Sequence, residues 1–196
     1  PTGEEGPCGP TTEIYSGGIE IWNIVFNQYY SKNEKLEPLK TPGIDTGMGL
    51  ERLAMVLQKV PTVFETDLFA SIIELIPEGF DKREKRIVAD HSRAINALIV
   101  DGVRPSNKEQ GYVLRRLIRR VVAYEFLLKI NFLNKLIKSD IFDDEKSKFL
   151  ETLEKGILEY SKIKDIDAQK AFYLYQSFGL PFDILKELDA EKTKSL

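Results

Sequence analysis

The sequence predicts an α+β fold in which a strand-rich first part is followed by an all-helical second part. In the first part, two runs of β-type residues, 11–15 and 19–30, are separated by a Ser-Gly-Gly turn. From Pro61 onward, apolar residues recur instead at the three- and four-residue spacing of amphipathic helices. This change of pattern indicates two structural units of different kinds.

The composition indicates a globular chain with a substantial hydrophobic core. Of its 196 residues 42% are hydrophobic, and no apolar run approaches the roughly 20 residues of a membrane-spanning helix. Cys8 is the only cysteine and His91 the only histidine, which excludes an internal disulfide and argues against a zinc site. We therefore expect a soluble, cytoplasmic protein that does not contact a membrane.

Residues 19–30 are predicted to form an interior strand of a sheet. Both faces of this run are largely apolar, a pattern typical of strands that are covered on both sides. Glu20 and Asn23 are polar exceptions, and a buried polar group requires a partner or a function. A polar turn and a glycine-rich loop, residues 31–49, are expected to lead from this strand into a helix at residues 50–59.

The second part is predicted to consist of helices separated by turn residues. Pro77-Glu78-Gly79 breaks the helical pattern, so we place the domain boundary at residues 77–82, between a first domain of residues 1–77 and a second of residues 83–196. The expected helices cover residues 65–76, 86–100, 110–128, 143–162 and 169–178, with a last short helix after Gly179-Leu180-Pro181.

The sharpest local feature is the segment 45–52, Asp-Thr-Gly-Met-Gly-Leu-Glu-Arg. Gly47 and Gly49 let the backbone approach a flat ligand, and a helix that begins there presents unpaired N–H groups to negative charge. Arg52, in the first turn, can bind phosphate oxygens through two parallel hydrogen bonds. The alternative is an ordinary turn before a helix with solvated charges, and a short glycine motif alone does not decide between them.

Positive charge is concentrated in residues 83–135. This window has twelve Lys and Arg against five Asp and Glu, a charge of +7, whereas the whole chain has −3. On the predicted helix 110–128, an apolar stripe lies opposite four arginines, Arg115, Arg116, Arg119 and Arg120. Such a face suits the phosphates of a nucleic acid, but pairing with the chain's own acidic segments is the commoner role of a charge run.

Two residues with reactive side chains are better explained by packing than by catalysis. His91 falls on the apolar face of its predicted helix, with Ile87 and Leu98, which favours a core histidine. Cys8 stands between two Gly-Pro pairs with no partner base evident, which favours a small packed side chain over a nucleophile.

Several separated motifs, taken together and in order, resemble the alanyl-tRNA synthetases, a family of class II aminoacyl-tRNA synthetases. Agreement over nearly the whole chain is far more specific than any single motif. The matching blocks are residues 6–10, 20–26, 45–52, 89–93, 101–107 and 111–120, followed by a weaker match at residues 171–183.

The resemblance implies that residues 1–77 are the C-terminal part of an antiparallel-sheet catalytic domain, with the third class II motif at its end. Arg52 then matches the arginine that contacts an ATP phosphate, Asp45 the carboxylate that receives the alanine ammonium, and Asn23 a polar group of the aminoacyl pocket. ATP and Mg²⁺ are the implied cofactors. The implied ATP and aminoacyl-adenylate pocket also includes Glu20, Trp22, Gly47 and Gly49.

The resemblance also implies that the helices form the family's tRNA-recognition region, which reads a G·U wobble pair in the acceptor stem of tRNA(Ala). Asn107 and Asp183 match the positions credited with that readout, one on each side of the pair. Arg119 and Arg120 are expected to hold the phosphate backbone, because phosphate contacts position a protein and base contacts specify. Arg104, Arg115 and Arg116 complete the expected tRNA-binding set.

The sequence departs from the family pattern in several places. Thr11 stands where a cysteine is usual, and Ser16-Gly17-Gly18 replaces a longer insertion. Residues 177–181 also differ from the usual motif, which weakens the assignment of Asp183. The first two class II motifs and the editing domain with its zinc ligands are not found, and the chain starts with Pro1, so we expect a processed protein or a piece of a longer enzyme.

Three functions therefore remain open. The first is a fragment of an alanine–tRNA ligase that is inactive alone, because an α-phosphate-binding arginine is missing, but able to bind tRNA. The second is a stand-alone RNA-binding or interaction module of the same fold. In the third, the basic helix pairs only with acidic segments of the chain and binds no nucleic acid.

Overall fold

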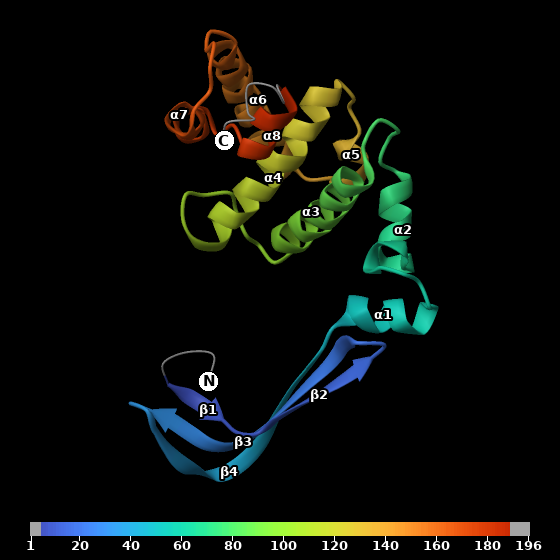
Figure 1. Cartoon of the computed structure of the whole chain (residues 1–196), viewed down its shortest axis with the longest axis vertical. Helices are drawn as coiled ribbons and strands as arrows, with labels where there is room; N and C mark the ends of the chain where they lie inside the picture. Colours follow the sequence, from blue (N-terminus) through green and yellow to red (C-terminus); the bar gives the residue numbers. More distant parts are fainter. Residues whose placement is uncertain (1–4, 189–196) are drawn as a thin grey trace. The chain divides into compact units, whose positions relative to one another are not determined.

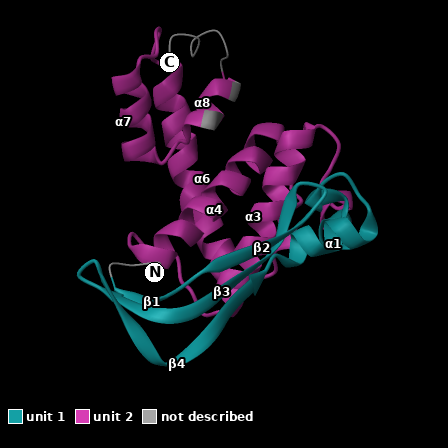
Figure 2. Cartoon of the chain, turned by 60° about the horizontal axis from the view of Figure 1, so that its bottom comes forward, with its two compact units in different colours: residues 1–70 teal, residues 71–196 magenta. Residues whose placement is uncertain are grey.

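The computed structural model describes residues 5–188, except for the side chains of residues 183 and 187. The chain divides into two compact units, residues 1–70 and residues 71–196 (Figure 2). The division falls inside α2, Asp67–Glu74, a few residues before the loop at 77–82 in which the sequence places the domain boundary. The antiparallel sheet of the first unit and the helices of the second confirm the expected α+β class.

The first unit is built around one four-stranded antiparallel sheet. Its strands are β1, Gly6–Cys8, β2, Thr11–Ser16, β3, Ile19–Lys32, and β4, Lys35–Met48 (Figure 1). β3 pairs with β4 along one edge and with β1 and β2 along the other. The prediction that residues 19–30 form an interior strand is thus confirmed.

The expected loop after that strand is wrong, because residues 35–48 form β4. Asn33 and Glu34 have φ values of 46° and 62°, which make the tight hairpin turn that folds β4 back on β3. Pro38 is tolerated because β4 pairs with β3 alone among the described strands, so one side of β4 needs no N–H donor. The glycines and prolines of this segment conceal a strand from a sequence-based prediction.

Gly9 allows the edge of the sheet to pass from β1 to β2. A Cβ atom at this position would lie 1.8 Å from the carbonyl oxygen of Phe26. The neighbouring Pro10 carbonyl accepts a hydrogen bond of 2.9 Å from the amide of Phe26. Only glycine permits this approach of the chain to the middle of β3.

Helix α1, Leu50–Gln58, begins directly after β4 and is tied to the sheet. The amide of Gly49, its N-cap residue, donates to the carbonyl of Ile21 on β3 over 3.1 Å. A short 3₁₀ helix, Val63–Glu65, then leads into α2. The glycine motif is therefore the end of a strand and the start of a helix.

The second unit is helical, as the sequence predicts. Its longer helices are α3, Lys82–Val100, α4, Glu109–Leu128, α6, Asp140–Ser161, and α7, Ala168–Phe178, to which α5, Leu133–Leu136, and α8, Phe182–Leu188, are added (Figure 1). α4 packs against both α3 and α6, and α6 packs against α7. Among residues 5–188, no helix is both long and apolar enough to cross a lipid bilayer.

Candidate functional site

The first candidate site lies on one face of strands β3 and β4. Asn23 is opposite Gly47, and Val25 is opposite Asp45 in the antiparallel register. Directly opposed residues and residues two apart share a face of a sheet, so these four positions form one contiguous patch. The patch offers a half-buried amide and an exposed carboxylate, which together can accept hydrogen bonds from an ammonium group.

Trp22 lies on the opposite face of the same strands, whereas a shift in the β2–β3 register pairs Glu20 with Tyr15 and so returns Glu20 to the face of Asn23. The indole Nε1 of Trp22 donates to Oγ1 of Thr46, and that hydroxyl donates to the backbone carbonyl of Asn23 over 3.0 Å. The structure thus brings Asn23, Asp45, Gly47 and Glu20 to one face of the sheet and separates them from Trp22, which was expected in the same pocket. Thr46, which links the strands, was not singled out from the sequence.

Arg52 is held beside β3 by weak, exchangeable contacts. Its Nη1 donates to the backbone carbonyl of Glu20 over 3.0 Å and lies 3.3 Å from Oε2 of the same residue. The side chains of Arg52 and Glu20 are 52% and 35% exposed, so water screens the pair and it contributes little to stability. A phosphate near the N-terminus of α1 can therefore compete with Glu20 for the guanidinium.

A metal ion finds few ligands in the described residues. No group of three or more His, Cys, Asp or Glu side chains within residues 5–188 is arranged to hold one. Mg²⁺ is commonly bound by one or two carboxylates together with substrate phosphates. The described residues therefore offer no preformed magnesium site made of protein side chains alone.

The second candidate site begins with Asn107, in the loop between α3 and α4. The hydroxyl of Ser106 accepts from the amide of Lys108 over 3.2 Å and donates to its carbonyl over 2.9 Å. A Cβ atom on Gly111 would lie 2.3 Å from this hydroxyl and 2.5 Å from the Arg104 carbonyl. The loop is therefore packed closely on the first turn of α4, which fixes the position of Asn107.

Arg115 and Arg119 of α4 are paired with the same buried carboxylate. Glu145 of α6 is 5% exposed, and its Oε1 lies 3.0 Å from Nε of Arg119 and 3.3 Å from Nε of Arg115. The guanidinium of Arg119 also lies 5.2 Å from the centre of the Phe149 ring. For these two arginines, the alternative of pairing within the chain is observed.

Arg116 differs because its side chain is exposed and makes no ion pair with another described residue. Its guanidinium lies 5.7 Å from the centre of the Tyr112 ring, and the hydroxyl of Tyr112 is 3.3 Å from that of Tyr175 on α7. The hydrogen bond to Tyr112 and partial burial raise the pKa of Tyr175, so this hydroxyl stays neutral at pH 7. Arg116 is thus an available cation beside two exposed aromatic rings.

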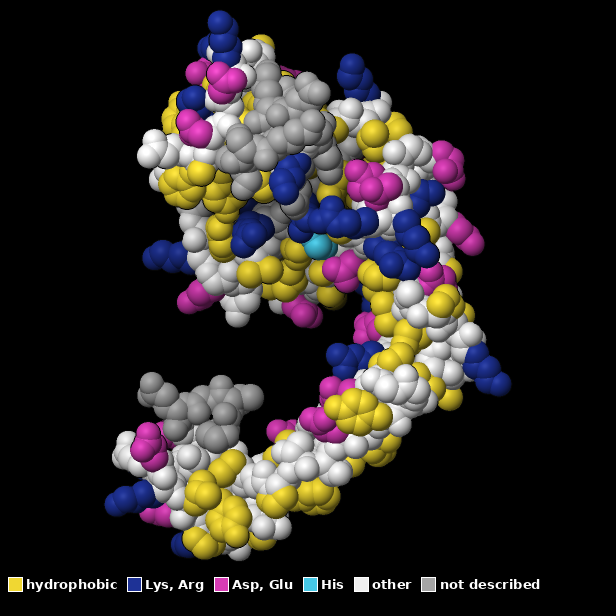
Figure 3. All heavy atoms as spheres, viewed as in Figure 1, with side chains coloured by type: hydrophobic (Ala, Val, Ile, Leu, Met, Phe, Trp, Pro, Cys, Tyr) yellow, Lys and Arg dark blue, Asp and Glu magenta, His cyan; other side chains and the backbone are white. Residues whose placement is uncertain are grey.

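Most of the expected tRNA-binding residues line one groove of about 920 Å³ between α4 and α7. Figure 3 shows Lys and Arg side chains gathered on a face of the helical unit. The aromatic wall of the groove was not predicted, although the aromatic residues spaced along 172–178 were a usable signal. The groove is lined by Asn107, Arg115, Arg116, Arg119 and Arg120 and by the aromatic residues Tyr112, Phe172, Tyr175, Phe178 and Phe182.

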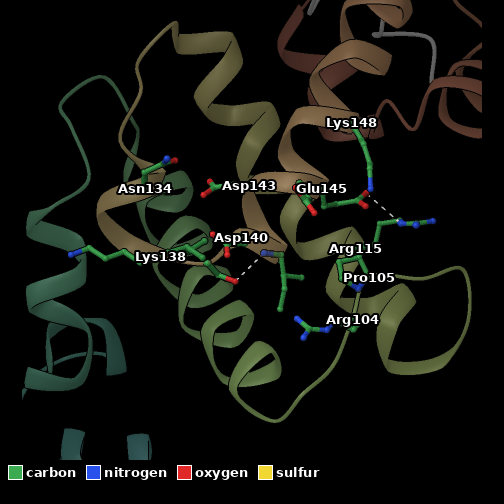
Figure 4. A pocket seen from close by; sticks show the side chains of 13 residues that line it. Arg104, Pro105, Arg115, Asn134, Lys138, Asp140, Asp143, Glu145 and Lys148 are labelled. Atoms are coloured by element: carbon green, nitrogen blue, oxygen red, sulfur yellow. Dashed lines mark hydrogen bonds and ion pairs between the residues drawn. The ribbon is translucent and has the colours of Figure 1, made fainter.

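Two expected residues, Arg104 and Asp183, are not among the described residues that line this groove. Arg104 lines a second groove of about 1060 Å³, whose lining contains both acidic and basic side chains and also includes Arg115 (Figure 4). The backbone of Asp183 belongs to α8, but its side chain is outside the described part of the chain. Its neighbours Pro181 and Phe182 line the first groove.

His91 is a largely buried residue of α3. Its Nδ1 lies 3.2 Å from the Oδ2 of Asp90, and its side chain is 16% exposed. Burial lowers the pKa of His91, although the bond to Asp90 opposes this shift and nearby Arg120 adds to it. The neutral, packed histidine agrees with the interpretation made from the sequence.

Comparison with known proteins places the sheet site and part of the second site in a region that matches one protein family. Residues 1–142 match the family described as tRNA synthetases class II (A). The chain belongs to this family. The matched region contains the whole sheet site and Asn107 with the arginines of α4, whereas α7 and α8 lie beyond it.

Individual family members are similar along nearly the entire chain. Alanine–tRNA ligases of Petrotoga mobilis, Halorhodospira halophila and Thermotoga maritima are 36%, 40% and 38% identical, over 98%, 97% and 95% of this chain. The chain spans only 28% to 29% of the length of these relatives. The alignment with the Petrotoga enzyme extends over 252 positions, so that relative has extra residues within the matched region.

Proposed function

We propose that this chain provides the acceptor-stem-binding surface and one wall of the aminoacylation site of an alanine–tRNA ligase that works in the cytoplasm. The observation that carries the proposal is the groove of the helical unit, in which Asn107 and the α4 arginines face the aromatic residues of α7. Nucleic-acid surfaces combine the same elements, cations for phosphates and an amide for a base edge.

Different residues of the groove are proposed to bind the phosphates and the bases of the RNA. Arg116 is exposed and has no described acidic partner, so it is the arginine best suited to a phosphate. Arg119 and Arg115 are partly neutralised by Glu145 and contribute less charge. Asn107 provides the neutral amide that a base edge in the minor groove can bind, and Asp183 is proposed to act from the other side.

The sheet site is proposed to hold alanine and ATP for activation to alanyl-adenylate and transfer to the terminal adenosine of tRNA(Ala). Asp45 and Asn23 receive the ammonium group of alanine on their shared face, and Arg52 leaves Glu20 to bind a phosphate of ATP. Both roles are positioning and charge stabilisation, without a covalent enzyme intermediate. Gly47 keeps the floor of the alanine site free of a side chain.

Binding of RNA hairpins that differ in one base pair tests the first half of this proposal. A labelled acceptor-stem hairpin with a G·U pair should bind more tightly than one with G·C, and the affinity should fall as salt rises. Asn107→Ala should reduce the ratio of the two affinities, whereas Arg116→Gln should weaken both hairpins alike and lower the salt slope by about one. Affinities that do not change with salt concentration would contradict the proposed RNA binding. An unchanged ratio of G·U to G·C affinity in Asn107→Ala would contradict it as well.

Alanine-dependent exchange of pyrophosphate into ATP separates the enzyme from the stand-alone module. The 196 residues are expected to show no exchange alone, because an arginine for the α-phosphate was not found among their motifs. Exchange by the isolated chain would overturn that expectation. Replacing the matching segment of a full-length relative with this chain should restore exchange if it is part of an enzyme, and Arg52→Ala should abolish it again; a module used only for binding would give an inactive chimera.

A further inference from the structure

The guanidinium of Arg115 lies between the proposed base-reading residue and a buried carboxylate. Its Nη1 donates to Oδ1 of Asn107, and its Nε lies 3.3 Å from Oε1 of Glu145. The side chain of Glu145 is 6% exposed and that of Arg115 is 24% exposed. Asn107, Arg115 and Glu145 therefore form a continuous polar chain from the groove into the protein.

This contact determines which way the Asn107 amide faces. A guanidinium has donors and no acceptor, so only the amide oxygen of Asn107 can face Arg115. The Nδ2 group then faces away from Arg115, and no hydrogen bond to another described residue uses it. Because Asn107 lines the groove, the group it has left for a ligand is a donor.

Glu145 keeps Arg115 in place. It belongs to the long helix α6, and its buried carboxylate is shared by Arg115 and Arg119, both of α4. Arg119 has the same carboxylate partner but no contact with Asn107 among the described interactions. The two arginines thus have the same charge and the same carboxylate partner, and among the described contacts only Arg115 touches the amide of Asn107.

We propose that Arg115 is a positioning residue that, held by Glu145, orients Asn107 so that its Nδ2 donates to an acceptor on the minor-groove edge of a base pair. The inference rests on the proposed RNA-binding function of this groove and adds the direction of the hydrogen bond. The acceptor is a pyrimidine O2 or a purine N3, because these are the minor-groove acceptors. The 2-amino group of guanine, a donor, is not the group that Asn107 reads.

Matched arginine variants of the full chain test the positioning role. Affinities for hairpins with G·U or G·C at one position are measured for Arg115→Gln and Arg119→Gln. Both variants should weaken binding to both hairpins, because each removes one positive charge. Only Arg115→Gln should lower the G·U to G·C ratio, by about two- to tenfold, the worth of one hydrogen bond. In an Asn107→Ala background it should lower the ratio no further.

A conservative pair keeps the test valid if a glutamine variant fails to fold, as judged by circular dichroism and thermal unfolding. Lysine retains the charge but has one nitrogen, so it does not reproduce the separate contacts of Nη1 with Asn107 and of Nε with Glu145. Arg115→Lys should therefore lower the ratio while Arg119→Lys leaves it unchanged. Equal ratios in the two lysine variants would overturn the inference.

The direction of the hydrogen bond has its own readout. A hairpin with inosine in place of the guanine lacks the 2-amino group. Asn107→Ala should therefore lower the affinity for the I·U hairpin by the same factor as the affinity for the G·U hairpin. If Asn107→Ala does not change the affinity for the I·U hairpin, Asn107 reads the amino donor of guanine, and the inference is overturned. If the wild-type chain does not distinguish G·U from G·C, or Asn107→Ala does not change the ratio, the proposed function itself fails and this inference with it.

Discussion

The sheet unit and the helical unit bury their apolar side chains to very different extents. In the helices, Leu114, Ile118 and Leu153 are completely buried. In the sheet, Ile44 on β4 is 66% exposed and Leu36 is 60% exposed, and hydrophobic side chains reach the surface along the strands (Figure 3). A sheet becomes stable when another layer covers its apolar face, so the helical unit should carry most of the stability of this chain.

The difference also separates the two candidate sites. The groove of the helical unit rests on interlocked contacts, such as the buried Glu145 with its two arginines. The sheet site is set mainly by main-chain pairing, and its cation, Arg52, is held by an exposed pair. The proposed RNA binding therefore depends on a site that the chain supports by itself, whereas the proposed binding of alanine and ATP depends on one with little side-chain support.

The largest expected effect comes from truncating a buried side chain of the helical unit. Leu153→Ala should lower the free energy of unfolding by about 2 to 5 kcal/mol, since it removes buried methyl groups and leaves a cavity. Ile44→Ala in the sheet should change it by about 0.5 kcal/mol or less. Urea unfolding followed by circular dichroism reports the helices, and fluorescence of Trp22, the only tryptophan, reports the sheet. Equal losses would contradict the contrast between the units.

A smaller effect is expected from two charged pairs, one in each unit. Glu125 is 6% exposed, pairs with Lys146 and accepts hydrogen bonds of 2.7 and 2.8 Å from the amides of Phe132 and Leu133. Glu125→Gln should cost about 1 to 3 kcal/mol, because a buried ammonium loses its charged partner. Glu20→Gln, which removes the exposed partner of Arg52, should cost less than about 1 kcal/mol.

The same urea titrations decide this second comparison. A larger loss for Glu20→Gln than for Glu125→Gln would mean that the Arg52 contact stabilises the sheet unit substantially. In that case Arg52 would not be free to exchange Glu20 for a phosphate, and the proposed role of Arg52 would need revision.

The smallest effect concerns the pH dependence of the helical unit. Burial lowers the pKa of His91, so protonation is less favourable in the folded than in the unfolded state. The helical unit should therefore lose stability as the pH falls through and below about 6.5, the ordinary histidine pKa, and keep it above that value. His91→Gln should show a flatter pH dependence of the thermal midpoint between pH 7 and about 5; an unchanged slope would exclude His91 as its source.

Part of this structure could be predicted from the sequence, and the failures have physical causes. The helices were predictable because an apolar stripe repeats along each of them, as on residues 110–128. β4 was missed because an edge strand tolerates Pro38 and glycines that normally interrupt strands. Because β4 was not predicted, the pairing register of β3 with β4 was not known from the sequence. The shared face of Asn23, Asp45 and Gly47 could therefore not be predicted. The Glu145 contact joins helices distant in sequence, and no local pattern encodes it.

Amide hydrogen exchange of the full chain, with and without a saturating blunt-ended acceptor-stem hairpin, tests the central claim most directly. If the helical unit binds the stem, exchange should slow in the Asn107 loop, the first turns of α4 and α7, and stay unchanged in β2, β3 and β4. Slower exchange confined to the sheet, or no change anywhere with RNA in excess, would contradict the claim.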